Sequence, residues 1–171
     1  MRKFLTSSMI VLLIIAGLLF AWWKSSLHQV RTLTTSVVIY AKPDRVWQVL
    51  TDFHSYPEWN PFIKQASGDA RAGSKLDLTI QLGDSTMNFR PRVLEADPGH
   101  ELRWRGRFVL PGLFDGEHSF VLEPEGNNTR VTQSEKFDGL LVVPLWKSMA
   151  PATLKGFHSM NQALKVRAET P

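Results

Sequence analysis

The chain has 171 residues, of which 43% are hydrophobic, with a formal net charge of +4 and no cysteine. This length allows one domain of ordinary size, and the missing cysteine excludes disulfides, thiolate metal sites and cysteine nucleophiles. Four basic residues and no acidic ones precede Thr32, so the 16 remaining basic residues balance the 16 acidic ones. A nucleic-acid-binding domain carries its basic excess on the folded part, so no nucleic-acid partner is expected.

The N-terminal segment 4–23 contains no charged residue. A helix of this length, at about 1.5 Å per residue, spans the roughly 30 Å of a bilayer core. It is flanked by cations and ends in an aromatic pair, as is typical of interfacial anchors: Arg2, Lys3, Trp22, Trp23 and Lys24. The alternative is a cleaved signal peptide, which the bulky tryptophans disfavour because they leave no small-residue cleavage site.

We therefore expect a single-pass transmembrane anchor over 4–23, a polar tether over 25–31 and one domain over 32–171. The cations before the apolar segment favour a cytoplasmic N-terminus, although Lys24 and Arg31 oppose it. This balance predicts a domain on the outer side of the membrane.

The domain begins with a predicted strand over 34–41, rich in Thr, Val and Ile, followed by a helix that starts at Lys42-Pro43-Asp44. The stretch 54–61 breaks that helix. Six segments with apolar residues at every second position then predict strands of an antiparallel sheet with one buried face: 62–67, 75–82, 86–95, 101–110, 117–123 and 130–137.

The chain ends in a predicted amphipathic helix over 144–169, which Pro151 kinks or starts. Gly156 in its middle predicts a close packing contact. The order of elements indicates an α+β fold in which a curved sheet of six to seven antiparallel strands wraps around this helix. Such an arrangement commonly encloses a space between sheet and helix.

Several stretches resemble the SRPBCC superfamily, the START-like and Bet v 1-like proteins that include polyketide cyclase/dehydrase-type domains. They are 41–53, 56–62, Glu101-Leu102-Arg103-Trp104, Gly116-Glu117-His118-Ser119-Phe120 and 129–135. The resemblance covers 34–168 and implies a helix-grip fold that holds an apolar ligand between the sheet and the C-terminal helix. The superfamily spans lipid carriers, receptors and enzymes, so the resemblance alone does not select a function.

The predicted inward faces supply a candidate ligand site. Four polar-capable residues share inward positions on neighbouring strands, among apolar residues: Trp104, His118, Gln133 and Glu135, with Phe89, Phe120, Phe157 and Met160 as the apolar contacts. His118 and Glu135 could orient a ligand hydroxyl or carbonyl, or act as a general base. A buried structural pair is the competing interpretation.

Two connections are unusually apolar, because loops are normally polar. They contain Leu113 and Phe114 in one case and Leu140 and Leu141 in the other. We expect them to gate the cavity and touch the bilayer; folding down as extra core is the alternative.

Three functions remain open: a membrane-anchored domain that binds a hydrophobic small molecule or lipid, a cyclase or dehydratase that uses the His/Glu pair, and an interaction module with a filled interior. The first is favoured, so enzymatic activity is not expected. The five histidines show no metal-ligand spacing and no phosphate-binding loop occurs, so neither a metal nor another cofactor is expected. The oligomeric state is left open.

Overall fold

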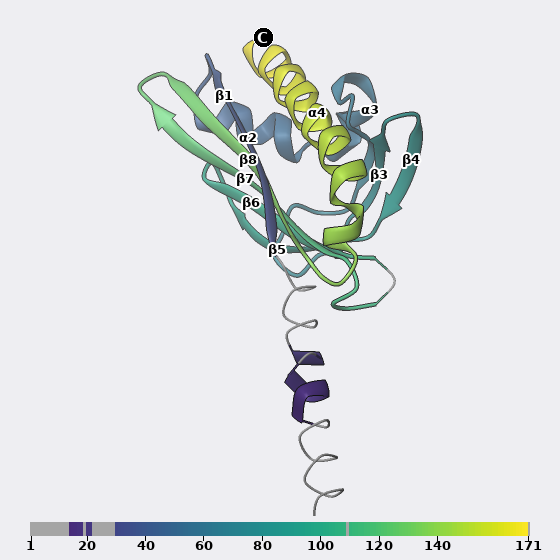
Figure 1. Ribbon diagram of the computed structural model, residues 1–171. Coiled ribbons are helices and arrows are strands. Elements are labelled where there is room, and N and C mark those ends of the chain that lie inside the picture. The colour runs from purple at the N-terminus through teal and green to yellow at the C-terminus, as the bar shows by residue number, and fades with distance from the viewer. Residues whose placement is uncertain (1–13, 19, 22–29, 109, 171) are drawn as a thin grey trace, which may run out of the picture.

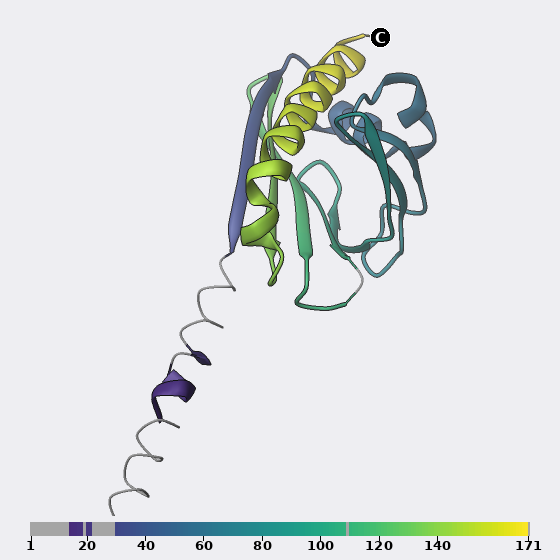
Figure 2. The ribbon, with the colours of Figure 1, turned by 45° about the vertical axis from the view of Figure 1, so that its right-hand side comes forward.

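A computed structural model describes residues 14–18, 20–21, 30–108 and 110–170 of the chain. From Arg31 onward they form one α+β domain, in which a long helix lies against a curved sheet (Figures 1 and 2). The elements in chain order are β1 (Arg31–Ile39), α2 (Pro43–Thr51), η1 (Phe53–Ser55), α3 (Tyr56–Trp59), β2 (Ile63–Ser67), β3 (Asp77–Leu82), β4 (Ser85–Phe89), β5 (Arg92–Asp97), β6 (Glu101–Arg107), β7 (Asp115–Glu125), β8 (Asn128–Asp138) and α4 (Val142–Glu169).

The described strands form two antiparallel sheets, one in the order β1-β8-β7-β6-β5 and one in the order β2-β3-β4. This corrects the expected single sheet of six to seven strands. The segment predicted as one strand over 86–95 is broken at Pro91, which has no N–H to donate to a neighbouring strand. The two sheets still adjoin, because the Leu76 N–H donates to the Pro91 carbonyl at 2.9 Å.

The C-terminal helix α4 is 28 residues long and begins at Val142, two residues before its predicted start. Its first turns run in a different direction from the rest (Figures 1 and 2), as expected where Pro151 removes one N–H from the helix. Gly156 confirms the predicted close contact, since a Cβ there would overlap the ring of Phe62.

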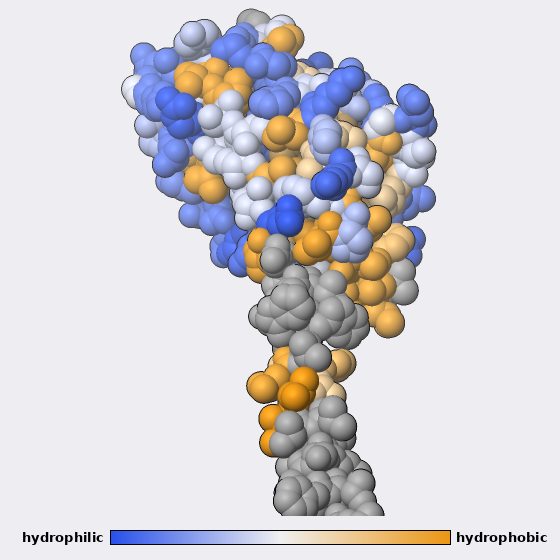
Figure 3. All heavy atoms as spheres, viewed as in Figure 1, coloured by the Kyte–Doolittle hydropathy of each residue, from blue (hydrophilic) through white to orange (hydrophobic). Residues whose placement is uncertain are grey.

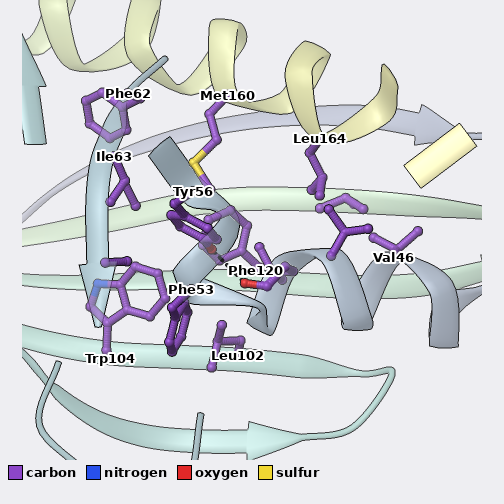
Figure 4. Packing of buried hydrophobic residues seen from close by; sticks show 14 of the residues in the cluster. Val46, Phe53, Tyr56, Phe62, Ile63, Leu102, Trp104, Phe120, Met160 and Leu164 are labelled. Carbon is purple, nitrogen blue, oxygen red and sulfur yellow. Dashed lines mark hydrogen bonds between the residues drawn. The ribbon is translucent and has the colours of Figure 1, made fainter. Parts of the chain in front are cut away.

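The core lies between α4, the short helices and the five-stranded sheet. Met160 and Leu164 point from α4 toward Phe120, and Leu102 lies beneath them on β6 (Figure 4). All four side chains are fully buried. This half of the space between helix and sheet is therefore filled by side chains.

Tyr56 at the start of α3 is fully buried, and its hydroxyl donates to the Leu50 carbonyl at 2.6 Å. Burial, and then the nearby charge of Asp52, raise the pKa of the Tyr56 phenol well above its ordinary value. In the unfolded chain the Tyr56 phenol ionises at its ordinary pKa near 10, whereas in the folded chain it stays protonated to higher pH. The stability that the phenol contributes is therefore complete below about pH 10 and is lost as the pH rises above it.

We expect Tyr56→Phe to lower the free energy of unfolding by about 1–2 kcal/mol at neutral pH, since it leaves the Leu50 carbonyl without its donor. Above about pH 10 the difference from the wild type should shrink, because the phenol no longer favours the folded state there. Urea unfolding measured at neutral and alkaline pH checks this. A difference that grows with pH would contradict it.

The predicted anchor over 4–23 falls mainly outside the described residues. Residues 14–18 and 20–21 are helical, and the side chains of Ile14, Ile15 and Leu18 are exposed. In the described part of the chain, no helix combines the length and the apolar character needed to cross a membrane.

Candidate functional site

A cavity of about 520 Å³ lies between the sheets and the N-terminal half of α4. This volume falls within the roughly 300–1,000 Å³ of pockets that hold small organic ligands. Its lining is almost entirely apolar, and the side chains that carry polar atoms are Trp104, His118, Glu135, Ser148 and Thr153. No lysine or arginine is among the described residues that line it.

Two glycines create much of this space. Gly106 on β6 and Gly116 on β7 are paired across the sheet and both line the cavity. The neighbouring row of the sheet, by contrast, carries the large rings of Trp104 and His118 at the equivalent inward positions. A Cβ on Gly116 would overlap Oε1 of Glu135, and one on Gly106 would come within 3.3 Å of the Phe89 ring. Neither glycine is among the predicted site residues, although a glycine inside a strand is a known sign of close approach.

The aromatic row next to the glycines closes the inner end of the cavity. His118 stacks on Trp104, with ring centroids 5.0 Å apart and planes 5° from parallel, and meets the Phe157 ring edge-on at 5.0 Å. Beyond this layer, Phe120 and Met160 belong to the buried core between the helix and the sheet. The layer therefore separates an open half of the space from a filled one.

A chain of hydrogen bonds fixes the His118 ring. The Gln133 amide nitrogen lies 3.1 Å from Nε2 of His118, and Oε2 of Glu135 lies 3.0 Å from Nδ1. Because an amide nitrogen can only donate, Nε2 must accept, so the proton of the neutral ring is on Nδ1 and is donated to Glu135. Both ring nitrogens are thus occupied within the protein. Glu135 keeps Oε1, which forms no hydrogen bond with any described residue.

The structure divides the eight predicted ligand contacts into two groups. Phe89, Trp104, His118 and Glu135 line the cavity. The other four are buried and do not line the cavity, because the inward position of a strand or helix residue does not determine how deep it lies. Phe157 is part of the aromatic layer, and Phe120, Gln133 and Met160 lie behind it.

The predicted gate residues are divided in the same way. Phe114 lines the cavity and packs on Phe137, with ring centroids 5.7 Å apart. Leu113, Leu140 and Leu141 do not line it, but the Leu140 and Leu141 N–H groups donate to the carbonyls of Gly112 and Leu113 and join the two loops. Gly139, at φ +129°, lets the loops approach closely.

Apolar side chains gather on the surface around these joined loops (Figure 3). We call the most exposed of them the apolar rim: Phe108, Leu110, Leu140 and Leu145, which are 38–63% exposed. Phe108 and Leu145 also line the cavity, so the rim surrounds its mouth. The chain enters the domain at this same end, where Arg31 lies over the Trp146 ring at 5.1 Å.

The arginines of β6 lie on the opposite, outer face of the sheet. Arg103 pairs with Glu101 at 2.8 Å and Glu117 at 3.3 Å, and the hydrogen bond that Arg103 donates to Glu101 is the main cause that raises the pKa of Arg103. Arg105 pairs with Asp115 at 3.3 Å. These internal pairs favour a solvated, charge-balanced face over an anion site. Nowhere in the described residues are three or more His, Asp or Glu side chains placed to hold a metal ion.

A family model described as polyketide cyclase/dehydrase and lipid transport matches residues 30–169. A search of curated proteins found no match. Among solved structures, the aromatase/cyclase Zhui from Streptomyces sp. R1128 superposes with a TM-score of 0.69 at 15% identity, over 82% of this chain and 94% of that one. A START superfamily protein from Mycobacterium smegmatis superposes with a TM-score of 0.64 at 24% identity, over 81% and 97% of the two chains.

These structural neighbours share the α+β helix-grip fold that the resemblance predicted, with an antiparallel sheet around a long C-terminal helix. At such identities they show the fold alone. The family match covers most of the chain and every described element of the domain. The chain therefore belongs to the polyketide cyclase/dehydrase and lipid transport family.

Proposed function

We propose that this domain binds a hydrophobic small molecule or lipid in the cavity between the sheet and α4. The observation that carries this proposal is the 520 Å³ apolar space, which closes at the aromatic layer and opens at the apolar rim. Burial of an apolar ligand there stabilises the complex by roughly 25 cal/mol per Å² of apolar surface removed from water. A domain with a filled interior would not have this space.

The N-terminal segment 4–23 would hold the domain at a membrane, on its outer side. Support comes from the apolar sequence of the segment. It also comes from the position of β1, which begins beside the apolar rim, so that the segment precedes the domain at the mouth of the cavity. The residues 24–30 reach about 25 Å at most when fully extended. An anchored domain would therefore keep the mouth of its cavity close to the lipid surface, where the rim can contact acyl chains.

A matched pair of helix substitutions tests ligand binding. Ala152 lines the cavity, whereas Val166 is an exposed residue on the same helix away from it. We expect Ala152→Phe to fill the space and weaken binding of a neutral hydrophobic dye at least tenfold, while Val166→Phe leaves binding unchanged. Dye fluorescence titrations of the full chain measure both. Equal binding by the two variants would show that the dye does not occupy this cavity.

The second candidate function is that of a cyclase or dehydratase, as the family name suggests. Its support is the free Oε1 of Glu135, which faces an apolar space where a carboxylate could remove a substrate proton. In such an enzyme His118 would be a positioning residue, because both of its ring nitrogens are occupied. Turnover of a polyketide-like substrate that is abolished in Glu135→Gln would favour this alternative.

A further inference from the structure

We propose that the cavity selects apolar molecules that carry a hydroxyl group, and that Glu135 recognises this group while Gly116 keeps its carboxylate in place. This inference rests on the proposed ligand-binding function and specifies the ligand class. It starts from the polar atoms that the cavity wall offers to a ligand.

Most polar groups of the wall are already engaged. The hydroxyls of Ser148 and Thr153 donate to the carbonyls of Leu145 and Met149 on their own helix, at 2.9 and 3.1 Å. His118 uses both ring nitrogens. Among the described side chains that line the cavity, Oε1 of Glu135 is therefore the carboxylate acceptor left for a ligand, and the lone pairs of the two hydroxyls are neutral acceptors.

This carboxylate oxygen matches a hydroxyl better than the other polar ends of common lipids. A hydroxyl carries an O–H that can donate to Oε1. A fatty acid carboxylate only accepts, and it would meet the negative charge of Glu135 in a wall without a described lysine or arginine. An ether lacks the donor altogether. The wall therefore discriminates by hydrogen-bond donation as well as by apolar burial.

The position of the Glu135 carboxylate depends on the neighbouring glycine. It is tied to His118 through Oε2, and its side chain is only 20% exposed. Oε1 lies over Gly116 so closely that a Cβ there would overlap it. The backbone of Gly116 is not in a left-handed conformation, so other residues could adopt it. Glycine is needed at this position because a side chain would take the space of the Glu135 carboxylate.

The glycine across the sheet provides a matched control. Gly106 is paired with Gly116 and also lines the cavity, but a Cβ on Gly106 would approach the Phe89 ring at 3.3 Å and not the carboxylate. Gly116→Ala should therefore displace Oε1, whereas Gly106→Ala should only narrow the cavity. This narrowing in Gly106→Ala should affect the binding of every ligand alike.

The test compares three probes of equal chain length on the full chain, namely 1-dodecanol, its methyl ether and ionised dodecanoate, by displacement of a neutral hydrophobic dye. We expect the wild type to bind the alcohol about tenfold more tightly than the ether, as for a hydrogen bond to a charged group. Glu135→Gln should reduce this preference and improve dodecanoate binding about tenfold. Gly116→Ala should abolish the preference, and Gly106→Ala should keep it.

Equal binding of alcohol and ether by the wild type would overturn the proposal, as would unchanged dodecanoate binding by Glu135→Gln. Both results would leave the apolar cavity as a ligand site. Failure of all three probes and of the dye would instead contradict the proposed function itself. If Gly116→Ala does not fold, as judged by circular dichroism, the Glu135→Gln comparison still decides.

Discussion

Replacing His118 by alanine is expected to lower the free energy of unfolding by about 3–5 kcal/mol, comparable to the loss of a buried aromatic ring. The His118 side chain is 4% exposed and lies between the rings of Trp104 and Phe157. Its removal leaves a cavity and takes the hydrogen-bond partners from Glu135 and from the buried Gln133 amide. Urea unfolding followed by tryptophan fluorescence measures the change.

The exposed His158 on α4 is the matched control, and His158→Ala should change the free energy of unfolding by no more than about 0.5 kcal/mol. A loss below about 1 kcal/mol in His118→Ala would mean that the aromatic layer does not depend on this ring. Glu135→Gln keeps the size of the side chain and should be much milder, which separates ligand recognition at Glu135 from the structural role of His118.

Deleting residues 1–24 is expected to move the chain from the membrane fraction to the soluble fraction almost completely. The segment 4–23 is the apolar part of the sequence to which we assign the anchor, and the rim alone provides far less apolar surface. Ultracentrifugation of membranes from cells that express each form, with an alkaline wash, measures the distribution. A truncated chain that stays in the washed membrane fraction would contradict the anchor.

The truncated chain also isolates the contribution of the rim. We expect Leu110→Asp together with Leu140→Asp to weaken its residual binding to lipid vesicles about tenfold or more, since both side chains are exposed at the cavity mouth. Tyr40 and Val166 are at least as exposed, at 68% and 66%, but they lie just after the end of β1 and near the end of α4, whereas the rim lies near the start of both elements. Aspartate at those positions should have little effect. Equal vesicle binding by both pairs of variants would show that the rim does not contact the membrane.

The alternation of apolar residues predicted the antiparallel sheet and the C-terminal helix because strand and helix periods differ clearly. It also brought His118 and Glu135 together, since both have inward positions on strands that the structure pairs directly. The break at Pro91 was visible in the sequence as a residue without an N–H, but the alternation of the residues around it hid two strands in one.

The alternation of apolar residues could not predict whether an inward residue lies at the cavity or in the packed core. Phe89 and Phe120 both have inward positions, yet the first lines the cavity and the second lies in the packed core. What separates them is the tertiary placement of the aromatic layer at Trp104, His118 and Phe157. The space itself comes from residues that lack side chains, Gly106 and Gly116, and the pattern of hydrophobic side chains gives no sign of them.

Native mass spectrometry of the purified full chain tests most directly whether the cavity holds an apolar ligand. We expect the wild type to carry an additional mass of a few hundred daltons that organic extraction recovers as a hydroxyl-bearing hydrophobic molecule, and Ala152→Phe to lack it. A wild-type chain that shows only its own mass after gentle purification, and gains none when apolar alcohols are added, would contradict the account.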